Sequence, residues 1–264
     1  MLKKFNLNLS LFVIPLSLVA AYFIFYQLMG HPDNFVDGDP ANEPINNNIL
    51  GVIYKGGPIV ILLLSFQLIM LVYVVERFLS IRYSAGKGNL RDFISGVRAK
   101  LAEGKWEELN EYCDQQQGAV ANVVKTGIGT YLSRKKVSQM DQKDIYLIQK
   151  ELEESTQLEL PLMNKNMFIL STIAQISTLV GLLGTVTGMI KAFAALATVG
   201  EPDPVGLAGG ISQALVTTAL GISTAAVTIV FYNYFANQIE KVTYAIDEAS
   251  FSIVQNLKLK YFKK

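Results

Sequence analysis

The sequence predicts an all-α integral membrane protein with four transmembrane helices, two of them extended into a helical cytoplasmic domain. Four windows of the 264-residue chain contain no charged residue, and they cover residues 5–30, 56–75, 166–190 and 204–239. About 20 apolar residues cross a hydrocarbon core of ~30 Å as a helix, and each window reaches that length. The windows lack the two-residue alternation of barrel strands, so we expect helices.

The composition argues against several functional classes. The net charge is +1, whereas nucleic-acid binding needs a basic surplus. Cys113 is the single cysteine, which excludes an internal disulfide and a cysteine-based zinc site, and His31 is the single histidine. The chain has no glycine-rich phosphate loop and no GxSxG turn. We therefore predict no enzyme activity, no metal site and no cofactor.

The first window, residues 5–30, is predicted to be a retained helix that starts in the cytoplasm. Lys3 and Lys4 precede it, and basic residues also flank the other windows on one side. These are Arg77, Arg82, Lys87, Lys165 and Lys241. The connection 31–55 is acidic, so both termini should be cytoplasmic. A cleaved signal peptide is the alternative, but 26 residues without a small-residue cleavage site before His31 favour a retained span.

The stretch 82–165 carries many charges of both signs and is predicted to form a helical cytoplasmic domain. Asn89 suits the cap of a first helix, a second helix begins near Trp106, and residues 119–132 form a third apolar stretch. Asp141 suits the cap of a fourth helix, which leads toward the third window. We expect that helix to be nearly continuous to Ala197, with a kink at Pro161.

The fourth window is predicted to begin a helix that runs on past the membrane. Asp203 and Pro204 suit its cap and first turn. An apolar stripe continues beyond the window at Ile239, Val242, Ile246, Ile253 and Leu257. We expect this continuation to form a cytoplasmic stalk.

The third and fourth windows are rich in small and hydroxyl residues, whereas the first two are bulky. One stripe on the third helix holds Ser171, Gln175, Thr178 and Thr185, and one on the fourth holds Gln213, Thr217, Thr224 and Thr228. The small residues Gly181, Gly184, Gly188 and Gly221 would let another backbone approach closely, and Gly184 and Gly188 are in GxxxG register.

Two interpretations of these hydroxyls stay open. In one they only pack helices, bonding to their own backbone or across helices. In the other they line a polar lumen between assembled copies. No Asp, Glu, His, Lys or Arg lies in the four windows, and threonine does not titrate near pH 7, so any proton path would need a carboxylate from a partner. Lys191, just beyond the third window, is expected to snorkel to the interface.

Two segments resemble the MotA/TolQ/ExbB proton channel family. Residues 181–190 read GLLGTVTGMI, are followed by Phe193, and resemble the third helix of the ExbB/TolQ branch. Residues 211–221, ISQALVTTALG, with Tyr232 and Asn233, are similar to the next helix. The likeness covers roughly residues 50–264.

The resemblance implies an ExbB-like subunit of a motor in the bacterial inner membrane. Five identical subunits would surround the transmembrane helices of two ExbD-like partners, whose aspartate carries protons, and the motor would energise a TonB-like protein for transport across the outer membrane. A TolQ-like or a MotA- or gliding-type stator subunit is the alternative within the family. A membrane scaffold with no ion path is the alternative outside it.

The resemblance also implies which residues face the proton. Thr185 and Thr218 match the family threonines that face the partner's aspartate, and Thr217 is the alternative that simple periodicity prefers. With Thr178 and Gln213, these residues form the predicted proton path.

The chain departs from the family pattern at three places. Many relatives carry glutamate where Gln213 stands, and Val227 occupies the position of a usual proline. The first span has no counterpart in three-span ExbB proteins, and four spans are similar to flagellar MotA.

The sequence therefore predicts five segments. Residues 1–57 hold the first transmembrane helix and an extracytoplasmic loop, and 58–81 hold the second transmembrane helix. Residues 82–165 form the cytoplasmic helical domain, 166–239 the third and fourth transmembrane helices of the pore wall, and 240–264 a cytoplasmic C-terminal helix.

Overall fold

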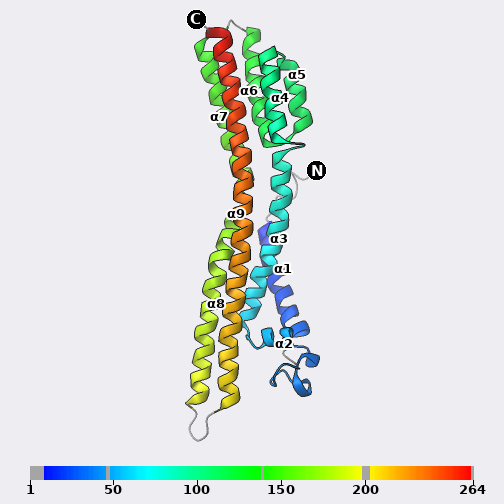
Figure 1. Ribbon diagram of the computed structural model, residues 1–264, viewed down its shortest axis with the longest axis vertical. Coiled ribbons are helices and arrows are strands. Elements are labelled where there is room, and N and C mark those ends of the chain that lie inside the picture. Colours follow the sequence, from blue (N-terminus) through cyan, green and yellow to red (C-terminus); the bar gives the residue numbers. More distant parts are fainter. Residues whose placement is uncertain (1–8, 46–47, 138–139, 198–202, 263–264) are drawn as a thin grey trace. The chain divides into compact units, whose positions relative to one another are not determined.

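The computed structural model describes residues 9–45, 48–137, 140–197 and 203–262, and within these ranges the protein is built of helices without a strand (Figure 1). One isolated bridge joins Phe35 to Pro44. Four helical segments are long and apolar enough to cross a membrane. The predicted fold class is confirmed. Lys3 and Lys4, which entered the prediction of orientation, lie outside the described residues.

The chain divides into two compact units. Unit 1 comprises Met1–Val75 and Phe168–Tyr232, and unit 2 comprises Glu76–Met167 and Asn233–Lys264. Two long helices, α3 (Ile59–Ala85) and α9 (Pro204–Phe262), contribute residues to both units.

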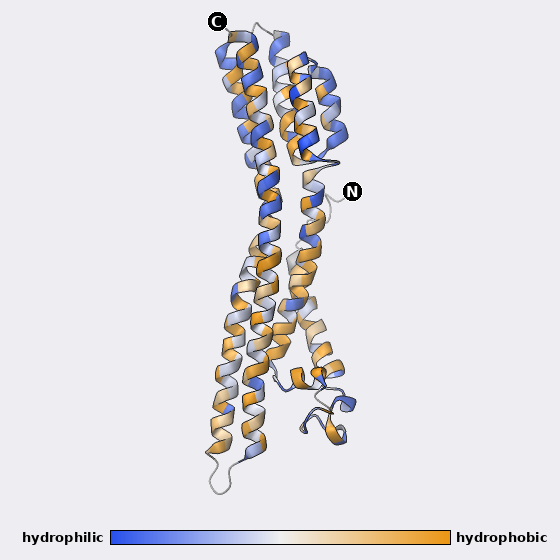
Figure 2. Cartoon of the chain, in the orientation of Figure 1, coloured by the Kyte–Doolittle hydropathy of each residue, from blue (hydrophilic) through white to orange (hydrophobic). Residues whose placement is uncertain are grey.

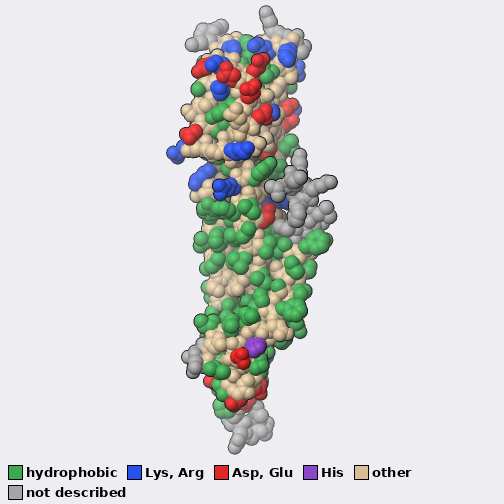
Figure 3. All heavy atoms as spheres, turned by 90° about the vertical axis from the view of Figure 1, so that its right-hand side faces the viewer, with side chains coloured by type: hydrophobic (Ala, Val, Ile, Leu, Met, Phe, Trp, Pro, Cys, Tyr) green, Lys and Arg blue, Asp and Glu red, His purple; other side chains and the backbone are tan. Residues whose placement is uncertain are grey.

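Unit 1 contains the apolar helices (Figure 2). They are α1 (Leu9–Phe23), which continues as the π-helical turn η2 (Ile24–Met29), the first part of α3, nearly all of α8 (Met167–Leu196) and the first part of α9. A buried cluster joins η2 to α3 through Phe25, Met29, Val60 and Leu64. Large apolar side chains face outward on these helices, as lipid contact requires (Figure 3).

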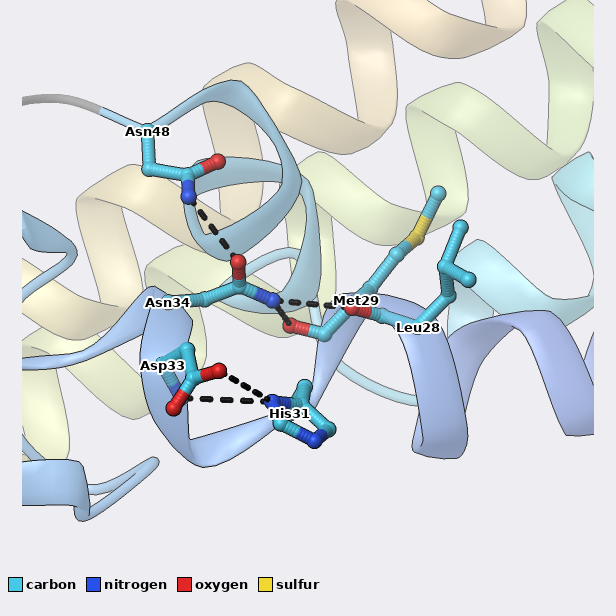
Figure 4. A network of polar contacts seen from close by, with 6 residues as sticks. All are labelled: Leu28, Met29, His31, Asp33, Asn34 and Asn48. Carbon is cyan, nitrogen blue, oxygen red and sulfur yellow. Dashed lines mark hydrogen bonds and ion pairs between the residues drawn. The ribbon is translucent and has the colours of Figure 1, made fainter.

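The connection after η2 is an ordered polar network (Figure 4). It contains the short turns η3 (Pro32–Asn34) and η4 (Val36–Gly38) and the helix α2 (Ile49–Tyr54). The buried Asn34 amide donates to the carbonyls of Leu28, at 2.8 Å, and Met29, at 3.0 Å, and accepts from Asn48 Nδ2 at 2.9 Å. Because these carbonyls end the first helix, Asn34 supplies the donors that the helix itself lacks there.

Unit 2 is a bundle with a charged surface. It contains α4 (Leu90–Glu103), α5 (Trp106–Gln116), α6 (Gly118–Val137), α7 (Gln142–Asn164) and the later parts of α3 and α9. The predicted caps are confirmed: Asn89 accepts from the Arg91 amide at 3.0 Å, and Asp141 forms a capping box with Asp144. Figure 2 shows hydrophilic and hydrophobic residues mixed along these helices, as amphipathic packing requires.

Aromatic side chains fill much of the core of unit 2. The Trp106 and Tyr131 rings lie 4.1 Å apart, and the Tyr131 hydroxyl lies 3.0 Å from that of Tyr261 on α9. Burial raises the pKa of Tyr131. The predicted apolar stripe of α9 is buried throughout, which confirms the continuation of that helix.

The predicted, nearly continuous helix from Asp141 to Ala197 is interrupted once, and the predicted kink at Pro161 is wrong, because the break lies at Lys165 and Asn166. Helix α7 ends at Asn164 and α8 begins at Met167, because Asn166 adopts a left-handed backbone, with φ of +64°, that a right-handed helix cannot contain. Pro161 lies inside α7 rather than at the break. Buried Arg77 donates to the Met163 carbonyl at 3.1 Å and so satisfies the last turn of α7.

Candidate functional site

Helices α8 and α9 meet along a line of small residues that we call the seam. Its members are Gly181, Gly184 and Gly188 on α8 and Gly210, Ala214, Thr217 and Gly221 on α9. A Cβ atom at Gly188 would lie 2.6 Å from the Gly210 carbonyl oxygen, and one at Gly181 would lie 3.0 Å from that of Thr217. The two backbones are therefore too close for larger side chains at these positions.

Most hydroxyls of α9 serve packing. Thr217 is fully buried against Gly184, and its hydroxyl donates to the Gln213 carbonyl at 2.8 Å, one turn earlier on the same helix. Buried Thr224 and Thr228 bond one turn back in the same way, at 2.7 and 2.6 Å. These groups already have an acceptor in their own helix, as in the first interpretation of the hydroxyl stripe.

Thr185 and Thr218 are arranged differently. Their hydroxyls form a hydrogen bond with each other across α8 and α9, and both side chains are only half buried. Thr218 also reaches the Ala214 carbonyl at 3.0 Å. We call Thr185 and Thr218 the hydroxyl pair. Because a hydroxyl can both donate and accept, this pair can pass a hydrogen bond to a group at the surface of unit 1.

A second polar contact lies toward the C-terminal end of α8. Lys191 Nζ donates to Gln213 Oε1 at 2.8 Å, and Gln213 Nε2 lies 3.4 Å from the Thr187 hydroxyl. Gln213 is almost fully buried. Lys191 was expected only to extend toward the membrane interface, but its ammonium is bonded to the facing helix. We call Thr187, Lys191 and Gln213 the polar link.

The sequence did not indicate the polar link, although one signal was present. Thr187 and Lys191 are four residues apart, so they share one face of α8, and Lys191 is the first cation after a charge-free window. Their partner Gln213 lies on the next helix, which no local pattern reveals. Thr178 lies seven residues before Thr185 on α8, half buried, and among the described residues it joins neither the hydroxyl pair nor the polar link.

The described residues contain no cluster of three or more His, Cys, Asp or Glu side chains that could hold a metal ion. Together, the hydroxyl pair and the polar link of unit 1 offer hydroxyls, the Gln213 amide and the Lys191 ammonium. None of these groups is a carboxylate that could carry a proton by itself.

Residues 115–248 match the family described as the MotA/TolQ/ExbB proton channel family, and this match covers half of the chain and the whole seam. The chain belongs to this family.

Individual relatives match shorter segments. An ExbB-like biopolymer transport protein of Synechocystis sp. is 41% identical over 86 residues, 32% of this chain and 41% of the relative. The biopolymer transport protein ExbB of Salmonella typhimurium is 43% identical over 70 residues, 26% of this chain and 29% of the relative. The Tol-Pal system protein TolQ of Pseudomonas aeruginosa is 36% identical over 88 residues, 33% of this chain and 35% of the relative. This chain thus spans less than half the length of each of these three.

Proposed function

We propose that this chain is an ExbB-like subunit of a motor driven by the proton-motive force in a bacterial inner membrane. One observation carries the proposal: half-buried Thr185 and Thr218 meet on a helix pair whose windows 166–190 and 204–239 contain no Asp, Glu, His, Lys or Arg. Such a wall can hydrogen-bond to a moving proton carrier, but it cannot carry the proton itself.

The proton-binding carboxylate would come from a second polypeptide. We expect several copies of the chain, five by family resemblance, to surround an ExbD-like single-span protein that carries an aspartate. The work would be done on a TonB-like protein, and transport across the outer membrane would follow. Membership of a proton channel family and the ExbB names of two relatives support this assignment.

The predicted path includes Thr178, Thr185, Thr217, Thr218 and Gln213. A hydroxyl that donates to an ionised carboxylate and accepts from a protonated one favours neither state strongly, which suits a proton relay. Lys191 would act near the Gln213 end of this path. Its positive charge would favour the ionised form of a carboxylate that comes within about 4–6 Å.

The orientation belongs to the proposal as well. The basic residues that flank the windows support an orientation with both termini in the cytoplasm and the connection 31–55 on the opposite side.

A TolQ-like role is the second candidate. The similarity to the Tol-Pal system protein TolQ of Pseudomonas aeruginosa supports it, because the identity is close to that of the ExbB relatives. The same wall and the same partner carboxylate would then serve maintenance of the cell envelope. A MotA-type or gliding-type stator subunit would use the same chemistry.

A scaffold without an ion path is the competing function outside the family's activity. The backbone-bonded hydroxyls of Thr217, Thr224 and Thr228 suit a scaffold, since each donates to a carbonyl of its own helix. The Thr224 hydroxyl also accepts from Gln67 Nε2 of α3 at 3.0 Å, which is a packing contact between helices. The hydroxyl pair suits the motor.

Valine replacements of the hydroxyl pair test the proposal, because valine keeps the shape of threonine and removes the hydroxyl. We expect Thr185→Val and Thr218→Val each to reduce proton-driven uptake of iron complexes or cobalamin at least about tenfold, with the oligomer intact on native gels. Thr172→Val is the matched control, since the Thr172 hydroxyl bonds to the Phe168 carbonyl on the same helix. Normal uptake by both variants would favour the scaffold.

Two further measurements separate the remaining alternatives. If Thr217→Val abolishes uptake while Thr218→Val does not, the proton path follows the Thr217 side of α9. The chain alone, reconstituted in liposomes with a pH-sensitive dye inside, should show no proton flux above empty liposomes. Flux without a partner would contradict the need for a carboxylate from outside.

A further inference from the structure

A groove of about 290 Å³ lies in unit 2 between α3 and α9. Its lining comes from α3, α9 and the first residue of α4, is mostly apolar and includes two cations. The lining residues are Phe78, Ile81, Arg82, Ala85, Leu90, Tyr234, Phe235, Gln238, Lys241 and Val242. Their spacing of three and four residues along each helix makes the groove a property of two regular helix faces.

The two cations lie just beyond the charge-free windows. The second window ends at Val75 and the fourth at Ile239, so Arg82 follows by seven residues and Lys241 by two. At 1.5 Å per residue these steps are roughly 10 Å and 3 Å along the helices. The headgroup region of a bilayer extends about 5–8 Å beyond each side of the hydrocarbon. Arg82 is the first exposed cation after the second window, Lys241 is the first cation after the fourth, and both long side chains can extend toward lipid phosphates.

Exposed tyrosines also lie near the ends of these two windows. Tyr83 on α3 is 69% exposed, and Tyr234 on α9 is also exposed. Tyrosine is enriched at membrane interfaces, where its ring lies among headgroups and its hydroxyl reaches water.

Arg82 and Lys241 have no hydrogen-bond or ion-pair partner among the residues that the structure describes. Other cations of unit 2 do: Arg98 pairs with Glu248 at 2.7 Å, and Lys125 pairs with Asp114. Two unpaired cations in the lining of a mostly apolar groove are complementary to a ligand that is anionic at one end and apolar at the other.

We propose that this groove binds an anionic phospholipid of the adjoining leaflet. The phosphate would lie between Arg82 and Lys241, and the start of an acyl chain would lie along Phe78, Ile81 and Ala85. The volume is at the lower end of the range for ligand pockets, about 300–1,000 Å³, so it seats part of a lipid rather than a protein segment. The inference rests on the membrane-spanning fold and is independent of the proposed motor activity.

Native mass spectrometry of the full-length oligomer in mild detergent tests the proposal, with phosphatidylglycerol and phosphatidylcholine added in turn. The wild type should retain phosphatidylglycerol in preference to phosphatidylcholine. The double variant Arg82→Gln/Lys241→Gln should bind phosphatidylglycerol about 30-fold more weakly, since each cation near an anionic lipid contributes about 1 kcal/mol.

Three further variants keep the test clear. Lys143→Gln/Lys258→Gln removes the same charge from unit 2, and Lys258 lines a separate groove between α7 and α9, so lipid retention should not change. The exchange Arg82→Lys/Lys241→Arg keeps both charges and should retain the lipid, which separates binding from a folding defect. Ala85→Phe should fill the groove and reduce retention several-fold with both charges present.

Equal retention of the two lipids by the wild type would overturn the proposal, as would Arg82→Gln/Lys241→Gln behaving like Lys143→Gln/Lys258→Gln. If Arg82→Gln/Lys241→Gln instead dissociates the oligomer without changing lipid retention, the groove is an interface between copies and the lipid site is wrong. Thr185→Val should keep lipid retention even where motor activity is lost, so the two proposals fail separately.

Discussion

The two units are stabilised by opposite kinds of residue. In unit 1, α8 and α9 approach through glycine, alanine and buried threonine, whereas the core of unit 2 consists of large side chains such as Trp106, Tyr131 and Leu152. Lipid gives helices no hydrophobic drive to associate, so close backbone approach must supply the packing. In water, burial of apolar area supplies it instead. We therefore expect unit 1 to lose stability when a small residue of the seam is enlarged. Unit 2 should lose stability when a large core residue is shortened.

The largest effect should come from shrinking the core of unit 2. Leu152 on α7 is 1% exposed and lies against Gly127, and Leu152→Ala would leave a cavity there. We expect a loss of about 2–5 kcal/mol in the free energy of unfolding. Denaturant unfolding followed by fluorescence of Trp106, the single tryptophan, measures it.

Leu158→Ala is the control for this prediction. Leu158 is on the same helix and is 73% exposed, so its replacement should change stability by less than about 0.5 kcal/mol. Equal losses in the two variants would mean that unit 2 does not depend on the packing of its core.

Enlarging the seam of unit 1 should have the next largest effect. In Gly188→Ala the new Cβ would meet the Gly210 carbonyl and the Ala214 amide nitrogen, at 2.6 and 2.7 Å, and we expect a loss of about 1–3 kcal/mol. Gly209→Ala is the control, because no atom lies within 4 Å of that Cβ and alanine favours the helix by about 1 kcal/mol. Thermal unfolding in detergent, followed by circular dichroism, measures both. A Gly188→Ala protein as stable as Gly209→Ala would remove the contrast between the units.

Local properties were predictable from the sequence. The four windows are visible because a span excludes charge residue by residue, and the caps at Asn89, Asp141 and Asp203 follow from short side chains that bond to the next turn. The division into five segments stays a prediction.

Properties that depend on a second helix were not predictable. Near the break at Asn166, buried Arg77 of α3 bonds to the Met163 carbonyl, a contact that no local pattern reveals, and the proline signal at Pro161 pointed to the wrong place. Thr217 and Thr218 differ by one helical step of about 100°, and only the position of α8 decides that Thr218 meets Thr185 while Thr217 meets Gly184. Their role in a proton path remains a proposal.

The polar link is a third kind of contact in unit 1. Variants of Gln213 measure how much it contributes to the free energy of unfolding. Gln213→Leu leaves the Lys191 ammonium and the Thr187 hydroxyl without this partner, and we expect a loss of about 1–2 kcal/mol. Gln213→Glu keeps the acceptor for Lys191 and turns this bond into an ion pair, so stability should stay near the wild type at pH 7. The unfolding assay used for the seam applies. The same loss in both variants would show that the Lys191 contact contributes nothing.

The last prediction needs no mutation. It concerns the reactivity of Cys113, which measures how well the core of unit 2 excludes water. Burial, with a smaller contribution from Asp114, raises the pKa of the Cys113 thiol to about 12, against about 8.5 for a free cysteine. Only the thiolate reacts, so iodoacetamide at pH 8 should alkylate the folded protein about a thousandfold more slowly than the protein in denaturant. With one cysteine in the chain, mass spectrometry reports this site alone.

The rate of alkylation in the folded state should also rise about tenfold per pH unit up to pH 11. A rate that levels off near pH 8.5 would mean that water reaches the core, and unit 2 would then lack the dry packing that separates it from the seam.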